Sequence, residues 1–240
     1  ALQLKNLRMY ELNPDLHAII HFTFVTNILW DGLIIEDFTT DQKGFMYNDG
    51  YLTGTIRNSI FRNATSTFVH DQVWASPLIG IKNGEEIIVE NCIFDNLVMM
   101  DDDSQALSFG GVLTPTYQQY YHFHNCLFSN IHSSKRGALI VGHAFPEMHI
   151  TNCTFAGHTG GGEALMINGD VTISNSIFYN QRPKEIAINP MDGVGIPTTL
   201  TLNNNLIRNG YSDIWQGINS TVNYSDTNIT GNPLFLGGDD

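Results

Sequence analysis

The sequence predicts an all-β solenoid in which short parallel strands stack coil upon coil. Two observations lead to this prediction. A motif of the form Asn-Cys/Ser-x-Phe recurs along the chain, and a run of alternating apolar and polar residues precedes most copies. Alternation with a period of two is typical of a half-buried strand, and recurrence at intervals of 20 to 50 residues indicates a repeat architecture.

The motif has six copies and a weaker seventh. The leading residues are Asn58, Asn91, Asn125, Asn152, Asn175 and, in a degenerate copy, Asn204, with the weaker copy at Asp31. Counted from Asp31, successive copies are 27, 33, 34, 27, 23 and 29 residues apart. A constant motif at variable spacing indicates similar strands joined by loops of different length. Because β-branched and aromatic residues dominate these segments, a helical solenoid is disfavoured.

Each coil is expected to hold three short strands and a tight corner at the Asn. The runs before the Asn are apolar at their first and third residues, which should point inward: Ile87–Glu90, Tyr121–His124, Met148–Thr151, Val171–Ser174 and Leu200–Asn203. After the Asn, the Cys or Ser and the Phe share one parity, which we also assign to the interior. A further strand is predicted in four segments: Ala106–Gly110, Ala138–Gly142, Ala164–Asn168 and Ile186–Asn189.

The repeat resembles the right-handed parallel β-helix of the pectate-lyase-like superfamily, with Asn, Ser or Cys ladders at a corner and stacked Phe residues inside. The resemblance covers roughly residues 25–225 and implies a single domain, residues 1–240. About eight coils at ~4.8 Å each would make a rod about 40 Å long. The segment Gly231–Phe235 resembles the end of β-helix regions in large secreted bacterial surface proteins. An extracellular or cell-surface location in a bacterium is implied, with other domains in the same parent chain.

The composition narrows the classes of partner. The 240 residues include 11 Lys and Arg against 24 Asp and Glu, which gives a net charge of −13. This balance argues against nucleic acid, whose phosphates require a concentrated basic surface, and against an anionic membrane surface. No apolar run approaches the ~18–20 residues of a membrane span. No signal peptide is visible at Ala1, and because the sequence does not start with Met we expect a processed or excised segment.

The three cysteines occupy the second position of three successive motifs, as Cys92, Cys126 and Cys153. An odd count excludes a complete disulfide framework. We expect reduced, buried thiols that pack beside Ser59 and Ser176, because free Cys behaves as a small hydrophobe. A disulfide between adjacent coils is feasible in distance, but its side-chain geometry would be strained.

An unusual group of histidines is expected on the outer surface. Parity places His122 and His124 on one face of one strand. The repeat register places His149 beside His122, and Glu90 and Thr151 on either side of His124. Three imidazoles and a carboxylate suit Zn²⁺ or acid–base chemistry near neutral pH. A solvated outer face explains the same residues and is the interpretation that we favour.

A second candidate metal site is the run Asp101, Asp102 and Asp103, in a loop just before a predicted strand. Carboxylates are the hard oxygen ligands that Ca²⁺ prefers. Adjacent residues cannot all face one ion, however, and the spaced pattern of a calcium loop is missing. A solvated acidic loop is therefore the favoured interpretation.

Three aromatic residues in longer insertions, Trp74, Tyr117 and Tyr120, can offer flat faces for sugar stacking. Aromatic side chains more often pack a loop onto its scaffold. We therefore treat a ligand-binding role as the less expected of the two.

A third candidate group is basic. Lys135 and Arg136 lie in one loop, Arg182 and Lys184 lie in a later loop, and Glu163 lies between them in sequence. The resemblance implies a role for such residues, because an Arg or Lys serves as the base in polysaccharide lyases of this superfamily. A solvated loop cluster is the favoured alternative. The Asn-Thr-Asp, paired-Asp and Arg-x-Lys motifs of the superfamily's glycosidases are absent as an internal set.

Two classes of function follow. The favoured one is an extracellular, non-catalytic β-helix module that acts as a rigid scaffold and recognises a glycan or a cell surface. The alternative is a polysaccharide lyase or glycoside hydrolase that acts on a plant or microbial polysaccharide. A convergent acid–base constellation beside a groove would separate the two, and the sequence offers only the weak groups above.

Overall fold

The computed structural model describes residues 2–10, 20–22, 27–40, 46–68, 79–101, 113–115, 120–133, 140–142, 147–160, 163–167, 169–180, 184–188 and 197–234. These residues form an all-β structure whose strands pair in parallel within two sheets. Across these ranges the only helix is the short 3₁₀ helix η1 (Gly210–Asp213), so none is long and apolar enough to cross a membrane. The arrangement is compatible with a β-helix solenoid.

The larger sheet has 15 strands. They are β1 (Leu2–Lys5), β3 (Ile20–Phe22), β4 (Asn27–Asp31), β6 (Met46–Arg57), β8 (Ile79–Glu90), β10 (Leu113–Pro115), β11 (Tyr120–His124), β14 (Ile140–Gly142), β15 (Glu147–Thr151), β18 (Leu165–Ile167), β19 (Asp170–Ser174), β21 (Ile186–Ile188), β22 (Thr198–Asn203), β24 (Ile214–Gln216) and β25 (Ser220–Tyr224). Three of them, β14, β18 and β21, lie inside predicted strand segments, whereas Ala106–Gly110 lies outside the described residues.

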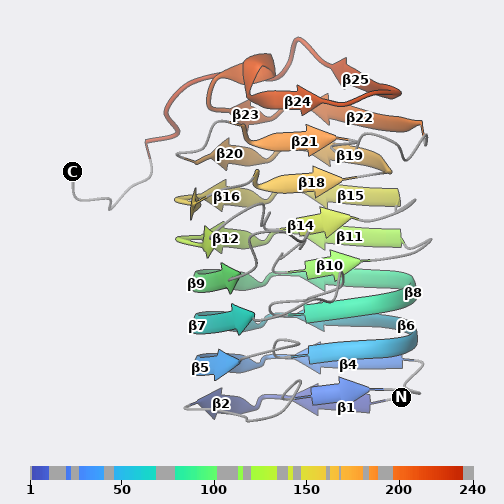
Figure 1. Ribbon diagram of the computed structural model, residues 1–240, viewed down its shortest axis with the longest axis vertical. Coiled ribbons are helices and arrows are strands. Elements are labelled where there is room, and N and C mark those ends of the chain that lie inside the picture. The colour runs from blue at the N-terminus through green and yellow to red at the C-terminus, as the bar shows by residue number, and fades with distance from the viewer. Residues whose placement is uncertain are drawn as a thin grey trace.

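The smaller sheet has 10 strands. They are β2 (Arg8–Tyr10), β5 (Ile34–Thr40), β7 (Ile60–Phe68), β9 (Ile93–Asp101), β12 (Leu127–Ser129), β13 (His132–Ser133), β16 (Thr154–Ala156), β17 (Thr159–Gly160), β20 (Ile177–Tyr179) and β23 (Leu206–Ile207). The chain passes repeatedly between the two sheets, and the strands of each sheet stack on one another in parallel (Figure 1).

The long strand β8 joins two rows of the larger sheet. Its first part, Ile79–Ile81, pairs with β10, and its last part, Glu86–Glu90, pairs with β11. From there one row continues through β14, β18, β21 and β24, and the other through β15, β19, β22 and β25. Both rows belong to the larger sheet, and the smaller sheet forms a separate row of parallel strands.

The Asn at the start of each motif forms the predicted corner. All six Asn residues adopt left-handed backbone angles, with φ between 51° and 57°. Asn accepts this conformation more readily than most residues, because its short polar side chain bonds locally. The Asn125 side chain donates to Asn91 Oδ1 at 2.8 Å, and the Asn58 side chain donates to Asp31 Oδ1 at 2.8 Å. The ladder therefore includes the weak copy at Asp31.

Two parts of this arrangement were not predicted. A further copy starts at Asn6, with φ of 49° and a backbone bond of 2.9 Å from Asn6 N to Asp31 O, so the repeat begins before residue 25. A second Asn ladder lies within the smaller sheet, with Asn63 in β7 and Asn96 in β9. In it, the Asn96 side chain donates to Asn63 Oδ1 at 2.9 Å, and the Asn63 side chain donates to Asp37 Oδ1 at 3.0 Å.

The core follows the predicted parity. The first and third residues of all five alternating runs are buried. The motif Phe residues are fully buried and form a stacked column: Phe61, Phe94, Phe128, Phe155 and Phe178. Neighbouring ring centroids lie 4.7 to 5.1 Å apart, and their planes are within 8° of parallel. The inward assignment of this column is confirmed.

The cysteines form a second buried column beside the Phe residues. Cys92, Cys126 and Cys153 are free thiols with at most 3% of their surface exposed, as predicted. Cys92 Sγ donates to Glu90 O at 3.3 Å, and Cys126 Sγ donates to His124 O at 3.3 Å. A hydrogen bond with the Cys126 thiol, together with burial, holds the pKa of Cys92 and of Cys153 above the ordinary value.

Candidate functional site

The outer surface of β8, β11 and β15 gathers most of the predicted candidates that the structure describes. We call this surface the histidine face and define it by six outward side chains: Glu86, Tyr120, His122, His124, Glu147 and His149. The three strands pair in register, so the outward residues form rows across them. His149 lies opposite His122, and Glu90 and Thr151 lie opposite His124. These neighbour relations confirm the register inferred from the sequence.

The middle row carries two imidazoles in contact. The rings of His122 and His149 stack with centroids 5.2 Å apart and planes 8° from parallel. Each imidazole also has its own carboxylate. His149 Nε2 lies 3.3 Å from Glu147 Oε1, and His122 Nε2 lies 3.7 Å from Glu86 Oε1. All four side chains are substantially exposed, so the pair can meet a ligand from solvent.

The outermost row places an aromatic ring between two acids. Tyr120 lies opposite Glu86 on one side and Glu147 on the other, and 53% of its surface is exposed. Asp170 on β19 continues the row beyond Glu147. The prediction that Tyr120 lies in an insertion is wrong, because Tyr120 is the first residue of β11. Its place in a paired strand holds the ring on the sheet surface.

In the innermost row, Glu90 lies beside the guanidinium of Arg57. Arg57 Nη2 donates to Asp31 Oδ2 at 2.9 Å, and Arg57 Nη1 lies 4.0 Å from Glu90 Oε1. Hydrogen bonds from Arg57 and Asn58 hold the pKa of Asp31 below its ordinary value. Glu90 therefore has an ion-pair partner on β6, in addition to its position opposite His124.

The metal hypotheses gain no support from this geometry. Across the described ranges, no group of three or more His, Cys, Asp or Glu side chains is arranged to hold a metal ion. Asp101 is the last residue of β9, not a loop residue, and this part of the calcium prediction is corrected. Zinc at the histidine face and calcium at the acidic run stay predictions.

Several candidates cannot be assessed. Seven lie outside the described residues: Trp74, Asp102, Asp103, Tyr117, Lys135, Arg136 and Arg182. Of the basic group, Lys184 is described, and its ammonium donates to the backbone carbonyl of Ser212. Glu163 is half-buried. The proximity of the two basic loops stays a prediction.

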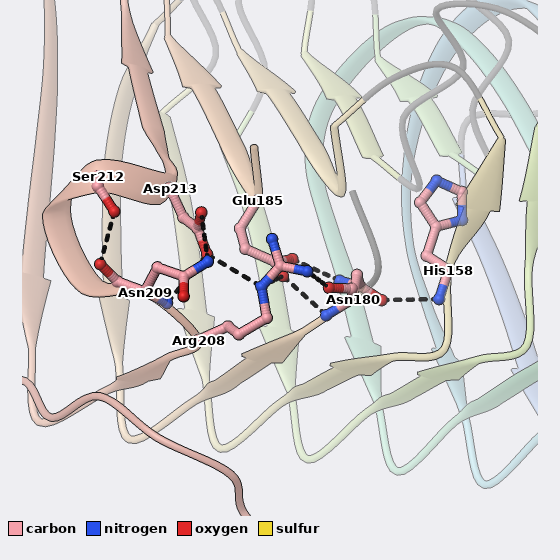
Figure 2. A network of polar contacts seen from close by, with 7 residues as sticks. All are labelled: His158, Asn180, Glu185, Arg208, Asn209, Ser212 and Asp213. Atoms are coloured by element: carbon pink, nitrogen blue, oxygen red, sulfur yellow. Dashed lines mark hydrogen bonds and ion pairs between the residues drawn. The ribbon is translucent and has the colours of Figure 1, made fainter. Parts of the chain in front are cut away.

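A buried polar network near the C-terminal rungs was missed by the sequence reasoning (Figure 2). Arg208, which follows β23, lies with its Nε 3.4 Å from Asp213 Oδ2 and 3.9 Å from Glu185 Oε1. Its Nη1 donates to the backbone carbonyl of Asn180. Asn180 in turn donates its backbone N–H to Glu185 Oε1 at 2.7 Å and its side-chain amide to Glu185 Oε2 at 2.6 Å. Its Oδ1 accepts the backbone N–H of His158 at 2.8 Å.

The side chains of this network are largely buried, so we interpret the network as structural. Glu185 is 0% exposed, the side chain of Asp213 is buried, and the side chain of Arg208 is 22% exposed. Burial raises the pKa of Glu185, while the hydrogen bonds from Asn180 oppose this effect. The contacts tie η1 to Asn180, directly after β20, and to Glu185, directly before β21. The only sequence signal was an isolated acid directly before an apolar strand, which is too common to identify a site.

Comparison of the chain with protein-family models, with curated proteins and with solved structures finds no match. Its function must therefore be argued from the residues and their geometry.

Proposed function

We propose that the chain folds as one right-handed parallel β-helix of the pectate-lyase-like type, with three short strands in each of about eight coils. Two features support this proposal. The long strand β8 pairs at its two ends with different rows, so the larger sheet supplies two strand positions per rung. The Asn corner lies between the larger and the smaller sheet at each of its copies, as in Asn125 between β11 and β12.

We further propose that this β-helix is a non-catalytic extracellular module of a bacterial surface protein that recognises a glycan through the histidine face. The observation that carries the proposal is the exposed row Glu86, Tyr120 and Glu147 beside the stacked pair His122 and His149. A sugar ring has an apolar face that packs on aromatic rings, and its hydroxyl groups donate hydrogen bonds to carboxylates. Because a paired sheet holds these groups in place, little conformational entropy is lost on binding.

The burial of Glu185 argues against this carboxylate as a general acid or base, since such a group must come within hydrogen-bond reach of the substrate. The alternative remains a polysaccharide lyase or glycoside hydrolase. Its candidate residues are Lys135, Arg136, Glu163, Arg182 and Lys184, of which Glu163 and Lys184 lie among the described residues.

The test is a panel of neutral, anionic and cationic polysaccharides, assayed with and without Ca²⁺ both for binding and for the release of unsaturated or reducing products. We expect binding without product. The double variant Tyr120→Ala/His122→Ala should weaken binding at least about tenfold, since aromatic anchors dominate recognition surfaces. Tyr211→Ala is the matched control, because Tyr211 is an exposed aromatic residue of the C-terminal rungs. Product release, or equal effects of the two variants, would contradict the proposal.

A further inference from the structure

We infer that the histidine face selects glycans that carry positively charged groups, such as amino sugars, over neutral and anionic glycans. This inference rests on the proposed glycan-binding role of the same face and specifies the chemistry of its ligand. The argument starts from the charges that the described outward side chains present.

Acids dominate the outermost row. Glu86 and Glu147 are exposed on either side of Tyr120, and the exposed Asp170 follows on the next strand. The guanidinium that lies nearest along β6 and β8, Arg57, is bonded to Asp31 and lies beside Glu90. Its charge is therefore largely offset within its own row. A uronate or sulfate on this face would be repelled by the carboxylates. Among the described outward residues of this face, no Lys or Arg without an acidic partner would offset this repulsion.

The row also has the geometry of a cation site. Adjacent strands lie ~4.8 Å apart, so each flanking acid starts about one strand spacing from the Tyr120 ring. A cation above the face of a Tyr ring is attracted by the negative face of its π-system. Carboxylates on both sides add Coulombic attraction at the same point, and the exposed phenol leaves room for a bulky ammonium group. An amino-sugar unit stacked on Tyr120 would thus place its charge between Glu86 and Glu147.

The stacked histidines add polar contacts without competing for the ring. The two carboxylates that flank Tyr120 each face one imidazole, with Glu147 paired to His149 and Glu86 to His122. These contacts orient the acids across the sheet surface. A ligand chain that lies along the row can therefore use the imidazoles as hydrogen-bonding groups while its cation remains at Tyr120.

Three β-1,4-linked hexamers that differ in charge test whether charge determines binding to the histidine face. They consist of N-trimethylglucosamine, whose charge is permanent, N-acetylglucosamine, which is neutral, and galacturonate, which is anionic. Calorimetry at neutral pH and low ionic strength should show the cationic hexamer binding about tenfold more tightly than the neutral one, the size expected for two exposed charge contacts. High salt should reduce this preference, because the carboxylates are solvent-exposed.

The double variant Glu86→Gln/Glu147→Gln should bring the cationic and neutral hexamers to within about threefold of one another. Asp226→Asn, which removes an exposed carboxylate after β25, should leave the preference unchanged. Equal binding of cationic and neutral hexamers by the unmodified protein would overturn this inference and leave the glycan-binding role standing. Failure of all three hexamers to bind would contradict the proposed function itself, and tighter binding of the galacturonate hexamer would overturn the charge argument.

Discussion

His122 and His149 stack face to face on adjacent strands, with ring centroids 5.2 Å apart. The two residues are 27 positions apart, and so are the motif residues Asn125 and Asn152 that follow them. One repeat therefore sets both contacts, because in-register parallel pairing carries each outward residue onto its counterpart in the next coil. A one-residue slip in either strand would have turned one imidazole into the core.

The same register stacks the Phe column in the core, so removing one ring should destabilise the protein. Phe128 is fully buried and stacks on Phe94 and Phe155. Phe128→Ala should lower the free energy of unfolding by about 3–5 kcal/mol, because it loses the transfer free energy of the ring and leaves a cavity. Urea denaturation measures this change. Tyr120→Ala is the control on β11, the preceding strand in sequence, and loss of its exposed ring should cost no more than about 0.5 kcal/mol. Similar losses in the two variants would contradict the assignment of the core.

The buried thiols make a chemical prediction. A thiol reagent should modify Cys92, Cys126 and Cys153 slowly in the native protein and rapidly after unfolding, because burial keeps the reagent from all three thiols. Timed labelling followed by mass spectrometry gives the rates, and the mass of the unlabelled protein should correspond to three free thiols. Fast labelling of all three thiols in the native protein would refute the prediction. A mass lower by two hydrogen atoms, which indicates a disulfide, would also refute it.

Features that the repeat dictates could be predicted from the sequence, and features outside it could not. The inward parity of Phe128 and the pairing of His122 with His149 both follow from motif spacing and alternation. The copy at Asn6 was missed because Leu7 stands where the other copies have Cys, Ser, Gly or Asn, and no Phe follows. The network of Glu185, Arg208 and Asp213 joins irregular segments with no periodicity, so nothing in the chain indicated that these residues meet.

The stability of the Asn corner should depend more on the left-handed backbone conformation than on the hydrogen bonds of the side-chain ladder. Asn125 has φ of 52° and donates to Asn91 Oδ1 at 2.8 Å. Asn125→Ala should destabilise the protein by about 1–2 kcal/mol or more, because a Cβ without a local polar partner is strained in the left-handed region. Asn125→Gly also loses the ladder bond but accepts this φ freely. Chemical denaturation should therefore rank the Gly variant above the Ala variant, whereas equal losses in the two variants would show that the side-chain bond dominates.

Glu36 should make stability fall in acid. Its carboxylate accepts hydrogen bonds from Arg62 and Arg8, and these hold its pKa below the ordinary value of 4.5. As the pH drops through about 4.5, the unfolded chain binds a proton before the folded chain does, so the free energy of unfolding falls until the depressed folded-state pKa is passed. Glu36→Gln removes this contribution. Denaturation curves from pH 6 downward should show a shallower decline in the variant, whereas parallel declines would argue against the ion pairs.

Glu185 should contribute a pH dependence of the opposite sign. Burial raises its pKa above 4.5, although Asn180 donates two hydrogen bonds to its carboxylate. Between pH 4.5 and the higher folded-state pKa, the folded chain keeps a proton that the unfolded chain has lost. The free energy of unfolding therefore decreases as the pH rises through this window and is level above it.

Glu185→Gln isolates this contribution, because Gln resembles the protonated acid and does not titrate. The stability advantage of the unmodified protein over the variant should be largest near pH 4.5 and should narrow as the pH rises. Lys184→Gln is a suitable control, since Lys184 is the neighbouring residue and its ammonium contacts only the Ser212 carbonyl in the described structure. Its stability difference from the unmodified protein should stay constant over the same range. A Glu185→Gln difference that widens with pH would mean that the ionised carboxylate, held by Asn180 and Arg208, is the form that stabilises the C-terminal rungs.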